Sequence, residues 1–210
     1  MSQAEIKRVV QISVVGAVAI ALIYLYCFEI SPVSIKAFRA FSAGLSAVTL
    51  FWVFYFQWGW RWPVLEKLFD KPNLNGTWIG KLITDWKDPD GQGIGARQFV
   101  LVVRQTFLRL HVVTFTDTFI ARSYAESVWI NRQRGIKRLI YLYAHDSTTV
   151  GDEGNREGAT ELRIEGEPPA RMIGRYWSNT KTNGSIEVER VSSEHAEAFQ
   201  DAMQMREEST

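Results

Sequence analysis

Two long uncharged segments occupy the start of the chain, and a pattern of alternating apolar and polar residues follows them. The first segment runs from Val9 to Phe28 and the second from Ala40 to Trp60, so each has about 20 residues. As helices they reach about 30 Å, the thickness of the hydrocarbon core of a bilayer. The sequence therefore predicts two transmembrane helices within residues 1–62.

The first segment has one competing interpretation, a cleaved signal peptide, because Lys7 and Arg8 precede it. Its apolar run is longer than is usual for signal peptides, and no cleavage site of small residues follows it. The second segment becomes rich in Phe, Tyr and Trp toward its end, which is typical of the membrane interface. We interpret residues 1–62 as a hairpin of two spans in contact with membrane lipids.

Lysine and arginine are more frequent at the outer ends of the two spans than in the loop between them. Because cytoplasmic flanks are enriched in these residues, this asymmetry predicts that both termini lie in the cytoplasm, with the bulk of the chain. The lone Cys27 lies in the first span and can form no intramolecular disulfide, in agreement with a reducing compartment. The outer flanks carry Lys7, Arg8, Arg61, Lys67 and Lys71, and the loop carries Lys36 and Arg39.

Small residues recur at four-residue spacing in both spans, and such stripes let helix backbones approach closely. They fit packing within the hairpin or packing between subunits, and the sequence does not separate these alternatives. The stripes are Ser13, Ala17 and Ala21 in the first span, and Ala40 with Gly44, Ser42 with Ser46, and Ala43 with Ala47 in the second.

Period-two alternation begins after a linker at residues 63–73 and continues to residue 191. Short turn-forming stretches separate the strands, and no amphipathic helix interrupts them. Residues 74–191 are therefore predicted to form an eight-stranded antiparallel up-and-down β-barrel, since closure removes exposed strand edges. The expected strands are 76–86, 97–105, 107–116, 118–131, 136–145, 159–166, 171–178 and 184–191.

The alternation also predicts which side chains face the barrel lumen. In strand 76–86 the inward face includes Trp78 and Thr84, and in strand 107–116 it includes residues 108, 110, 112 and 114. Strand 118–131 places mostly small residues on one face, at positions 119, 121, 123, 125, 127 and 129. These small residues either make room for Trp78, Tyr141 and Tyr176 or leave a ligand cavity. The loops 87–96, 116–118, 146–158 and 178–183 meet at the barrel mouth opposite the linker, where a ligand enters most easily.

The near-neutral net charge of +1 averages three unequal regions. Residues 1–62 carry five Lys or Arg against two Asp or Glu, whereas residues 192–210 carry one against five. The middle region keeps a small positive excess, too small to favour binding of long nucleic acid. Residues 192–210 form an acidic tail with apolar residues at near-helical spacing, which predicts either a fraying helix or a segment packed on the barrel.

Catalytic and metal-binding motifs are not found in the sequence. The three histidines are scattered, without metal-ligand spacing, and no nucleophile elbow or Walker loop occurs. The glycines of residues 90–95 lie between two strands and open no helix, so we interpret them as a hairpin loop. The sequence predicts a non-enzymatic protein without a cofactor or metal.

A cluster around the seventh strand indicates ligand binding instead. It combines two large aromatics, two arginines, one lysine and short hydrogen-bonding side chains, which together suit a small nucleotide. The alternative is that the aromatics are core residues and the polar residues form a turn. The predicted ligand-binding residues are Arg175, Tyr176, Trp177, Asn179, Thr180 and Lys181, with Thr84 and Tyr141 from the lumen.

A family resemblance rests on the order of the chain, two spans followed by a barrel, and on two motifs. LNGTWIG opens the first strand at 74–80, and GRYW at 174–177 precedes a turn of Asn, Thr and Lys. Across residues 5–191 the chain resembles the two-transmembrane β-barrel effectors of bacterial cyclic-oligonucleotide anti-phage signalling (CBASS). These are also described as SMODS-associating two-transmembrane, β-strand-rich proteins.

The resemblance implies a receptor in the bacterial inner membrane that is activated by a cyclic dinucleotide. In that family, binding is thought to drive homo-oligomerisation and membrane disruption, which kills the infected cell. Two other functions remain open from the residues alone: a membrane-anchored, lipocalin-like carrier of an apolar molecule, and a structural protein with a filled barrel.

Overall fold

The structure, a computed structural model, describes residues 3–31, 34–66, 68–86, 92, 93, 95–131, 133–145 and 156–208. It has two compact units. The first comprises Met1–Lys71 with Thr106–Leu108, and the second comprises Pro72–Gln105 with Arg109–Thr210.

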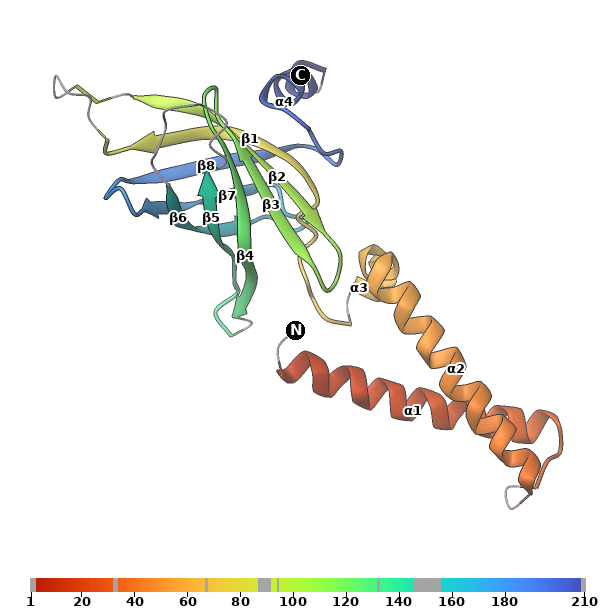
Figure 1. Cartoon of the computed structure of the whole chain (residues 1–210). Helices are drawn as coiled ribbons and strands as arrows, with labels where there is room; N and C mark the ends of the chain where they lie inside the picture. Colours follow the sequence, from red (N-terminus) through yellow and green to blue (C-terminus); the bar gives the residue numbers. More distant parts are fainter. Residues whose placement is uncertain are drawn as a thin grey trace. The chain divides into compact units, whose positions relative to one another are not determined.

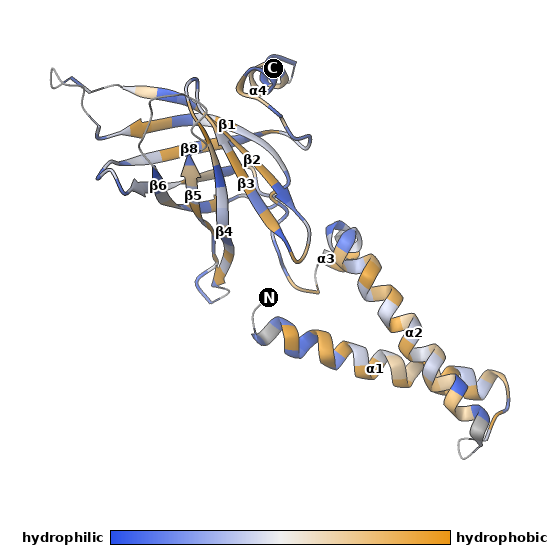
Figure 2. Ribbon diagram, viewed as in Figure 1, coloured by the Kyte–Doolittle hydropathy of each residue, from blue (hydrophilic) through white to orange (hydrophobic). Residues whose placement is uncertain are grey.

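The first unit is built on two long antiparallel helices, α1 (Gln3–Cys27) and α2 (Ile35–Gln57) (Figure 1). Their stretches Glu5–Cys27 and Lys36–Gln57 are long and apolar enough to cross a membrane. Figure 2 shows apolar residues on both helices along their length, and only 11% and 28% of the two apolar windows are buried. Because a core helix of a soluble protein would be mostly covered, this exposure indicates a membrane protein.

One stripe of small residues brings α1 and α2 together. A Cβ atom added at Gly44 would lie 2.6 Å from the carbonyl oxygen of Ala17, so only glycine allows this approach. Ala21 and Ala40 are fully buried nearby, and Trp52 Nε1 donates a hydrogen bond to Ser13 Oγ at 2.7 Å. Packing within the hairpin therefore uses one stripe of α2, whereas the stripes at 42 and 46 and at 43 and 47 are exposed.

Helix α2 ends before the predicted limit of the second span. A 3-10 turn, η1 (Gly59–Arg61), and a short helix, α3 (Pro63–Glu66), follow it. They belong to an aromatic cluster that includes Tyr55, Trp60, Phe69 and Phe107. Phe107 comes from the turn Thr106–Leu108, and its backbone N–H donates to the carbonyl oxygen of Phe56 at 3.3 Å.

The second unit is a closed barrel of eight strands in which each strand is antiparallel to its neighbours, and β8 pairs with β1. This confirms the predicted fold class. Several strands differ from the predicted bounds, most clearly β3, because Thr106–Leu108 form the β2–β3 turn. The strands are β1 (Gly76–Thr84), β2 (Ala96–Gln105), β3 (Leu110–Phe115), β4 (Ile120–Asn131), β5 (Ile136–His145), β6 (Glu157–Glu165), β7 (Arg171–Ser178) and β8 (Asn183–Ser192).

Side-chain hydrogen bonds fasten the start of β1 to the end of β2. Asn75 Nδ2 donates to the carbonyl oxygen of Gln105, and Asn75 Oδ1 accepts from the Gln105 N–H, both at 2.8 Å. Gln105 Oε1 in turn accepts from the backbone N–H of Leu74 at 2.8 Å. All these polar groups are buried and paired, which rigidifies this end of the barrel.

A β-bulge in β4 overturns the predicted inward face of the second half of that strand. The β4–β5 register shifts between Ser123 and Ala125. A bulge inserts one residue, so the alternation changes face beyond it. Val128 consequently packs against the lumen core, while Trp129 is 44% exposed. The prediction that positions 125, 127 and 129 continue the inward face was therefore wrong.

The acidic tail ends in a helix, α4 (Phe199–Glu208), packed against the outer wall of the barrel (Figure 1). Outward-facing residues of β1, β2 and β3, among them Ile79, Val100 and Val102, form one apolar cluster with Ala196 and Ala202. The second of the two predicted alternatives for the tail, packing on the barrel, therefore describes this structure.

Candidate ligand-binding site in the barrel lumen

The lumen of the barrel is filled at one end and hollow at the other. At the filled end Trp78, Leu139 and Met172 are fully buried in one apolar cluster, and Trp78 Nε1 donates to the carbonyl oxygen of Leu74 at 3.0 Å. At the hollow end a cavity of about 590 Å³ remains. We call this hollow end the upper lumen, and its cavity has the size of a small-molecule binding site.

The upper lumen has a mixed lining of hydroxyl groups, aromatic rings and cations. Hydroxyls and cations bind phosphate and sugar oxygens, and aromatic faces stack on bases. The lining consists of Leu82, Thr84, Trp86, Arg97, Phe99, Thr114, Thr116, Thr118, Phe119, Ala121, Tyr141, Tyr143, His145, Arg156, Thr160, Tyr176, Ser178, Thr180, Thr182 and Ile186.

Three adjacent strands, β1, β8 and β7, form one wall of this cavity. Thr84 and Tyr176 both pair with Gly184, so they lie on either side of it in the sheet. A Cβ atom at Gly184 would lie 2.4 Å from Tyr176 Cε1. Glycine therefore leaves the space that the Tyr176 ring occupies.

Three tyrosine hydroxyls in the lumen stay protonated near neutral pH. Burial raises the pKa of Tyr141, and the neighbouring Thr160 side chain offsets only part of that rise. Burial likewise raises the pKa of Tyr143 and of Tyr176. Because a neutral phenol can donate a hydrogen bond, the lumen offers donors to phosphate or base oxygens without adding negative charge.

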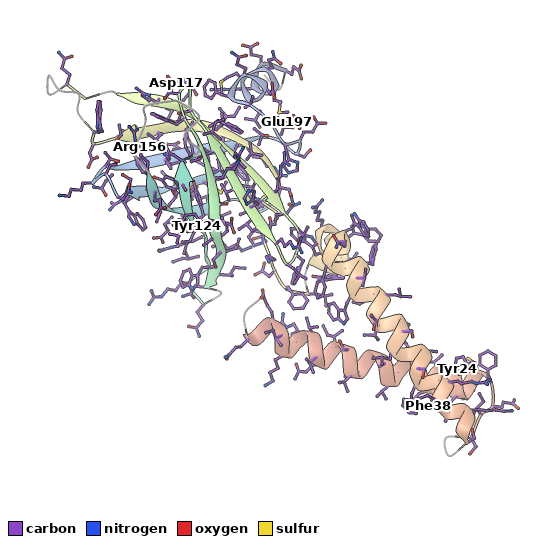
Figure 3. The ribbon with its side chains drawn as sticks, in the orientation of Figure 1. Tyr24, Phe38, Asp117, Tyr124, Arg156 and Glu197 are labelled. Atoms are coloured by element: carbon purple, nitrogen blue, oxygen red, sulfur yellow. The ribbon has the colours of Figure 1, made fainter. Side chains whose placement is uncertain are left out.

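Two arginines bring positive charge to the rim of the upper lumen. Arg97 Nη1 lies 3.5 Å from Asp117 Oδ1, and the Arg156 guanidinium lies 5.0 Å from the centre of the Phe119 ring. Figure 3 shows Asp117 and Arg156 at the same end of the barrel. The long loops predicted at this mouth fall largely outside the described residues, at 87–91, 94 and 146–155.

The turn between β7 and β8 adds a cluster of hydroxyl groups to the rim. Ser178 Oγ lies 2.6 Å from Thr182 Oγ1 and 2.8 Å from Thr180 Oγ1. Asn179 fastens this turn to β6, since its backbone N–H donates to the carbonyl oxygen of Glu157 at 2.8 Å. Hydroxyl groups presented in this way can donate to a phosphate oxygen or accept from a base.

The structure gathers only half of the predicted ligand-binding residues around the lumen. Thr84, Tyr141, Tyr176 and Thr180 line it. Arg175 and Trp177 alternate with Tyr176 along β7 and line a groove on the outer wall, while Asn179 and Lys181 are exposed in the β7–β8 turn. A role in ligand binding stays a prediction for all eight.

Several lumen residues were missed in the sequence, although their strand positions carry the signal. Arg97 shares the period-two face of Phe99. Tyr143 likewise follows Tyr141 by two positions in β5. Thr116, in the β3–β4 turn, and Arg156, just before β6, carry no such alternation, because neither lies inside a strand.

No group of His, Cys, Asp and Glu that could hold a metal ion occurs among the described residues. The upper lumen instead presents hydroxyl groups, aromatic rings and cations around a cavity, and these groups are suited to binding a ligand.

Comparisons with known proteins point to the same region. Residues 69–190 match the family described as Cap15, cyclic dinucleotide receptor domain, and this match covers more than half of the 210 residues. A search of the curated proteins finds no match. Receptor domains of this kind have a binding role. With its two apolar N-terminal helices and closed eight-stranded barrel, the chain belongs to the Cap15 cyclic dinucleotide receptor family and is a two-transmembrane, cyclic dinucleotide-binding effector of CBASS.

Proposed function

We propose that a cyclic dinucleotide binds in the upper lumen and that binding drives the protein to oligomerise and disrupt the bacterial inner membrane. The observation that carries the site is the combination of Arg97 and Arg156 with hydroxyls and aromatic rings around one cavity of about 590 Å³. A cyclic dinucleotide has two phosphates for the cations and two bases for the rings.

The polarity of the cavity favours this ligand over the apolar molecule of a lipocalin-like carrier. Seven of the lining residues are threonines, and two are arginines. An apolar ligand would leave these polar groups without water or partners, at a cost in free energy. A ligand rich in hydrogen-bonding groups satisfies them.

Oligomerisation follows from the ligand only if the assembled state binds it more tightly than the single subunit does. Each assembled subunit then contributes two helices, so ligand binding concentrates membrane spans. Abortive infection is the proposed outcome.

The greater number of Lys and Arg residues outside the hairpin than in its loop supports a cytoplasmic N-terminus and barrel.

Calorimetric titration of the full chain in lipid nanodiscs tests the binding step. The probes are cyclic di-adenylate, cyclic di-guanylate, cyclic adenylate-guanylate and cyclic di-uridylate. We expect at least one to bind, and Arg97→Ala to weaken that binding about tenfold or more, because a charge-assisted hydrogen bond to phosphate is lost. Arg134→Ala, at an exposed turn position, is the matched control.

Liposomes that contain the full chain and a trapped dye test the membrane step. The probe that binds in the titration should release the dye from liposomes with the wild-type chain and, at the same concentration, much less from those with Arg97→Ala. Absence of binding by all four probes, or co-purification of a lipid that fills the lumen, would contradict the proposal.

A further inference from the structure

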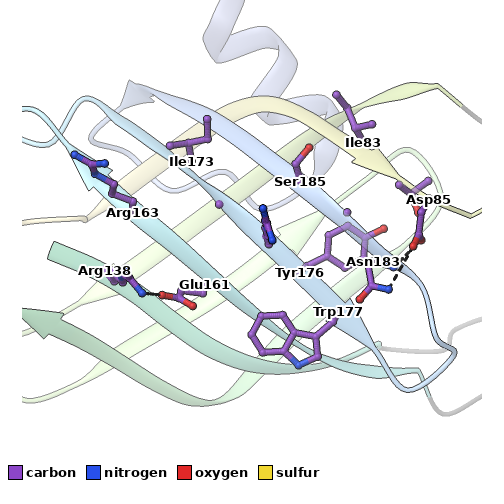
Figure 4. A pocket seen from close by; sticks show the side chains of 14 residues that line it. Ile83, Asp85, Arg138, Glu161, Arg163, Ile173, Tyr176, Trp177, Asn183 and Ser185 are labelled. Carbon is purple, nitrogen blue, oxygen red and sulfur yellow. Dashed lines mark hydrogen bonds and ion pairs between the residues drawn. The ribbon is translucent and has the colours of Figure 1, made fainter. Parts of the chain in front are cut away.

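A second hollow lies on the outer wall of the barrel, separate from the lumen (Figure 4). This outer groove has a volume of about 1040 Å³ and runs over β1, β5, β6, β7 and β8. Its charged lining residues are Arg138, Arg163 and Arg175 with Asp85 and Glu161, and Ile83 and Trp177 are among its apolar ones.

The composition of the outer groove is that of a protein interface. Ile83 is 52% exposed and Trp177 is 46% exposed, and Trp and Arg are enriched where proteins bind each other. Arg138 pairs with Glu161 along the groove (Figure 4), and Arg163 Nε lies 3.7 Å from Glu165 Oε1. In the part of the chain that the structure describes, no carboxylate pairs with Arg175.

An acidic surface lies on the other side of the same barrel. Helix α4 and the segment before it cover the outward faces of β1, β2 and β3, whereas the outer groove is centred on β6 and β7. In the closed order of eight strands, β2 and β6 are four positions apart and so face opposite ways. Residues 192–210 hold five acidic residues and one basic residue, and Glu194, Glu197, Glu207 and Glu208 are exposed.

We propose that the outer groove binds the acidic C-terminal segment of a second copy of this chain. The two surfaces differ and lie on opposite sides, so the contact is head to tail and extends from copy to copy without closing into a dimer. Every barrel added in this way is covalently joined to a hairpin, so a row of barrels gathers transmembrane helices. The inference rests on the proposed function, for which it supplies the contact between subunits.

The wall shared by lumen and groove gives the ligand a route to this contact. Thr84 and Tyr176 line both cavities. Their neighbours in sequence, Ile83, Arg175 and Trp177, point outward into the groove. A ligand that contacts Thr84 and Tyr176 holds β1 and β7 in place, and this favours the state in which the groove is ordered for a second copy.

Charge reversal in the full chain, in nanodiscs or detergent, tests the contact. We expect Glu207→Lys with Glu208→Lys, and separately Arg163→Glu with Arg175→Glu, each to lower the association constant by about tenfold or more, since like charges then face each other. Combining all four changes should restore association. Arg134→Glu is the control for a change of net charge. Mass photometry with the tightest of the four probes measures the assembly, and failure of the combined variant to recover would overturn the contact.

A crosslinking experiment, run with and without the tightest of the four probes, tests the head-to-tail geometry. In a Cys27→Ser background, Ser185→Cys marks the groove and Gln204→Cys marks α4, both at exposed positions. With a bismaleimide in membranes, the double variant should give a ladder of dimers, trimers and larger species, and each single variant at most traces.

The two proposals fail separately. A wild-type chain that binds a probe while the double variant gives no ladder overturns the head-to-tail contact alone. A ladder from a chain that binds none of the four probes overturns the proposed function and supports the contact. Dimers formed through Ser185→Cys by itself would mean that groove meets groove, which also overturns the contact.

Discussion

Tyr176 on β7 and Thr84 on β1 flank Gly184 of β8, with which each of them pairs in the sheet, and the Tyr176 ring lies against this glycine. The three residues form the wall between the upper lumen and the outer groove. Because neighbouring residues of a strand point to opposite faces, a change at this wall affects both the ligand site and the outer surface.

Replacing Gly184 by alanine should damage this wall. The added Cβ would lie 2.1 Å from the carbonyl oxygen of Ile83 and 2.4 Å from Tyr176 Cε1, so the backbone or the tyrosine ring must move. We expect a loss of about 1–3 kcal/mol in the free energy of unfolding, and weaker binding of cyclic dinucleotides. Thermal unfolding and calorimetric titration measure the two effects.

Gly93→Ala is the control for that substitution, because no atom lies within 4 Å of its added Cβ. Equal unfolding temperatures for the two alanine variants would show that the wall tolerates the methyl group.

Alkaline pH should destabilise the barrel through its buried tyrosines. Burial raises the pKa of Tyr141, Tyr143 and Tyr176 above the ordinary value of 10.0, so the unfolded chain ionises at a lower pH than the native barrel. Their contribution to the free energy of unfolding is fully present below about pH 10, and it is lost as the pH rises through the raised native pKa values. Unfolding temperatures measured from pH 8 to pH 11, in steps of about one unit, should fall at the upper end.

The variant Tyr141→Phe should reduce this alkaline loss, whereas Tyr124→Phe, at a residue 57% exposed, should leave it unchanged. An identical pH profile for wild type and Tyr141→Phe would refute the assignment to this phenol.

Phe107→Ala should loosen the aromatic cluster of the first unit. The Phe107 side chain is fully buried, and its ring centre lies 5.0 Å from that of Phe69 and 5.4 Å from that of Tyr55. Truncating a buried phenylalanine costs about 3–5 kcal/mol. Hydrogen exchange of residues 52–69 in nanodiscs should increase. The neighbouring Leu108 is 53% exposed, so Leu108→Ala should change little, and equal exchange in both variants would argue against the cluster.

Thr77→Val should release the segment that leads to α4. Thr77 Oγ1 donates to the carbonyl oxygen of Glu194 at 2.7 Å and accepts from the Ala196 N–H at 2.9 Å. Valine keeps the shape but leaves both backbone groups unpaired, at a cost of about 1–3 kcal/mol. Limited proteolysis should then cleave residues 193–208 faster than in wild type. Ser193→Ala, at an exposed position, is the control, and equal cleavage rates would show that this link does not retain the tail.

Much of the architecture was predictable because it depends on local periodicity. The twenty uncharged residues that begin at Val9 predict a membrane span whatever surrounds them, and period-two alternation predicts strands. Short turns between successive strands leave an up-and-down order as the simplest arrangement, and closure of eight strands follows from the need to pair every edge. The inward position of Thr84, Tyr141 and Tyr176 follows from the same alternation.

Other features depend on contacts between distant residues, which only the tertiary structure decides. The bulge between Ser123 and Ala125 exchanges the faces of β4, because one inserted residue reverses a period of two. The sequence alone thus determined the two spans, the strands and their order. The tertiary structure decided which end of the lumen stays hollow and that the acidic tail packs on the barrel wall, because cavity shape and tail packing depend on side chains far apart in sequence.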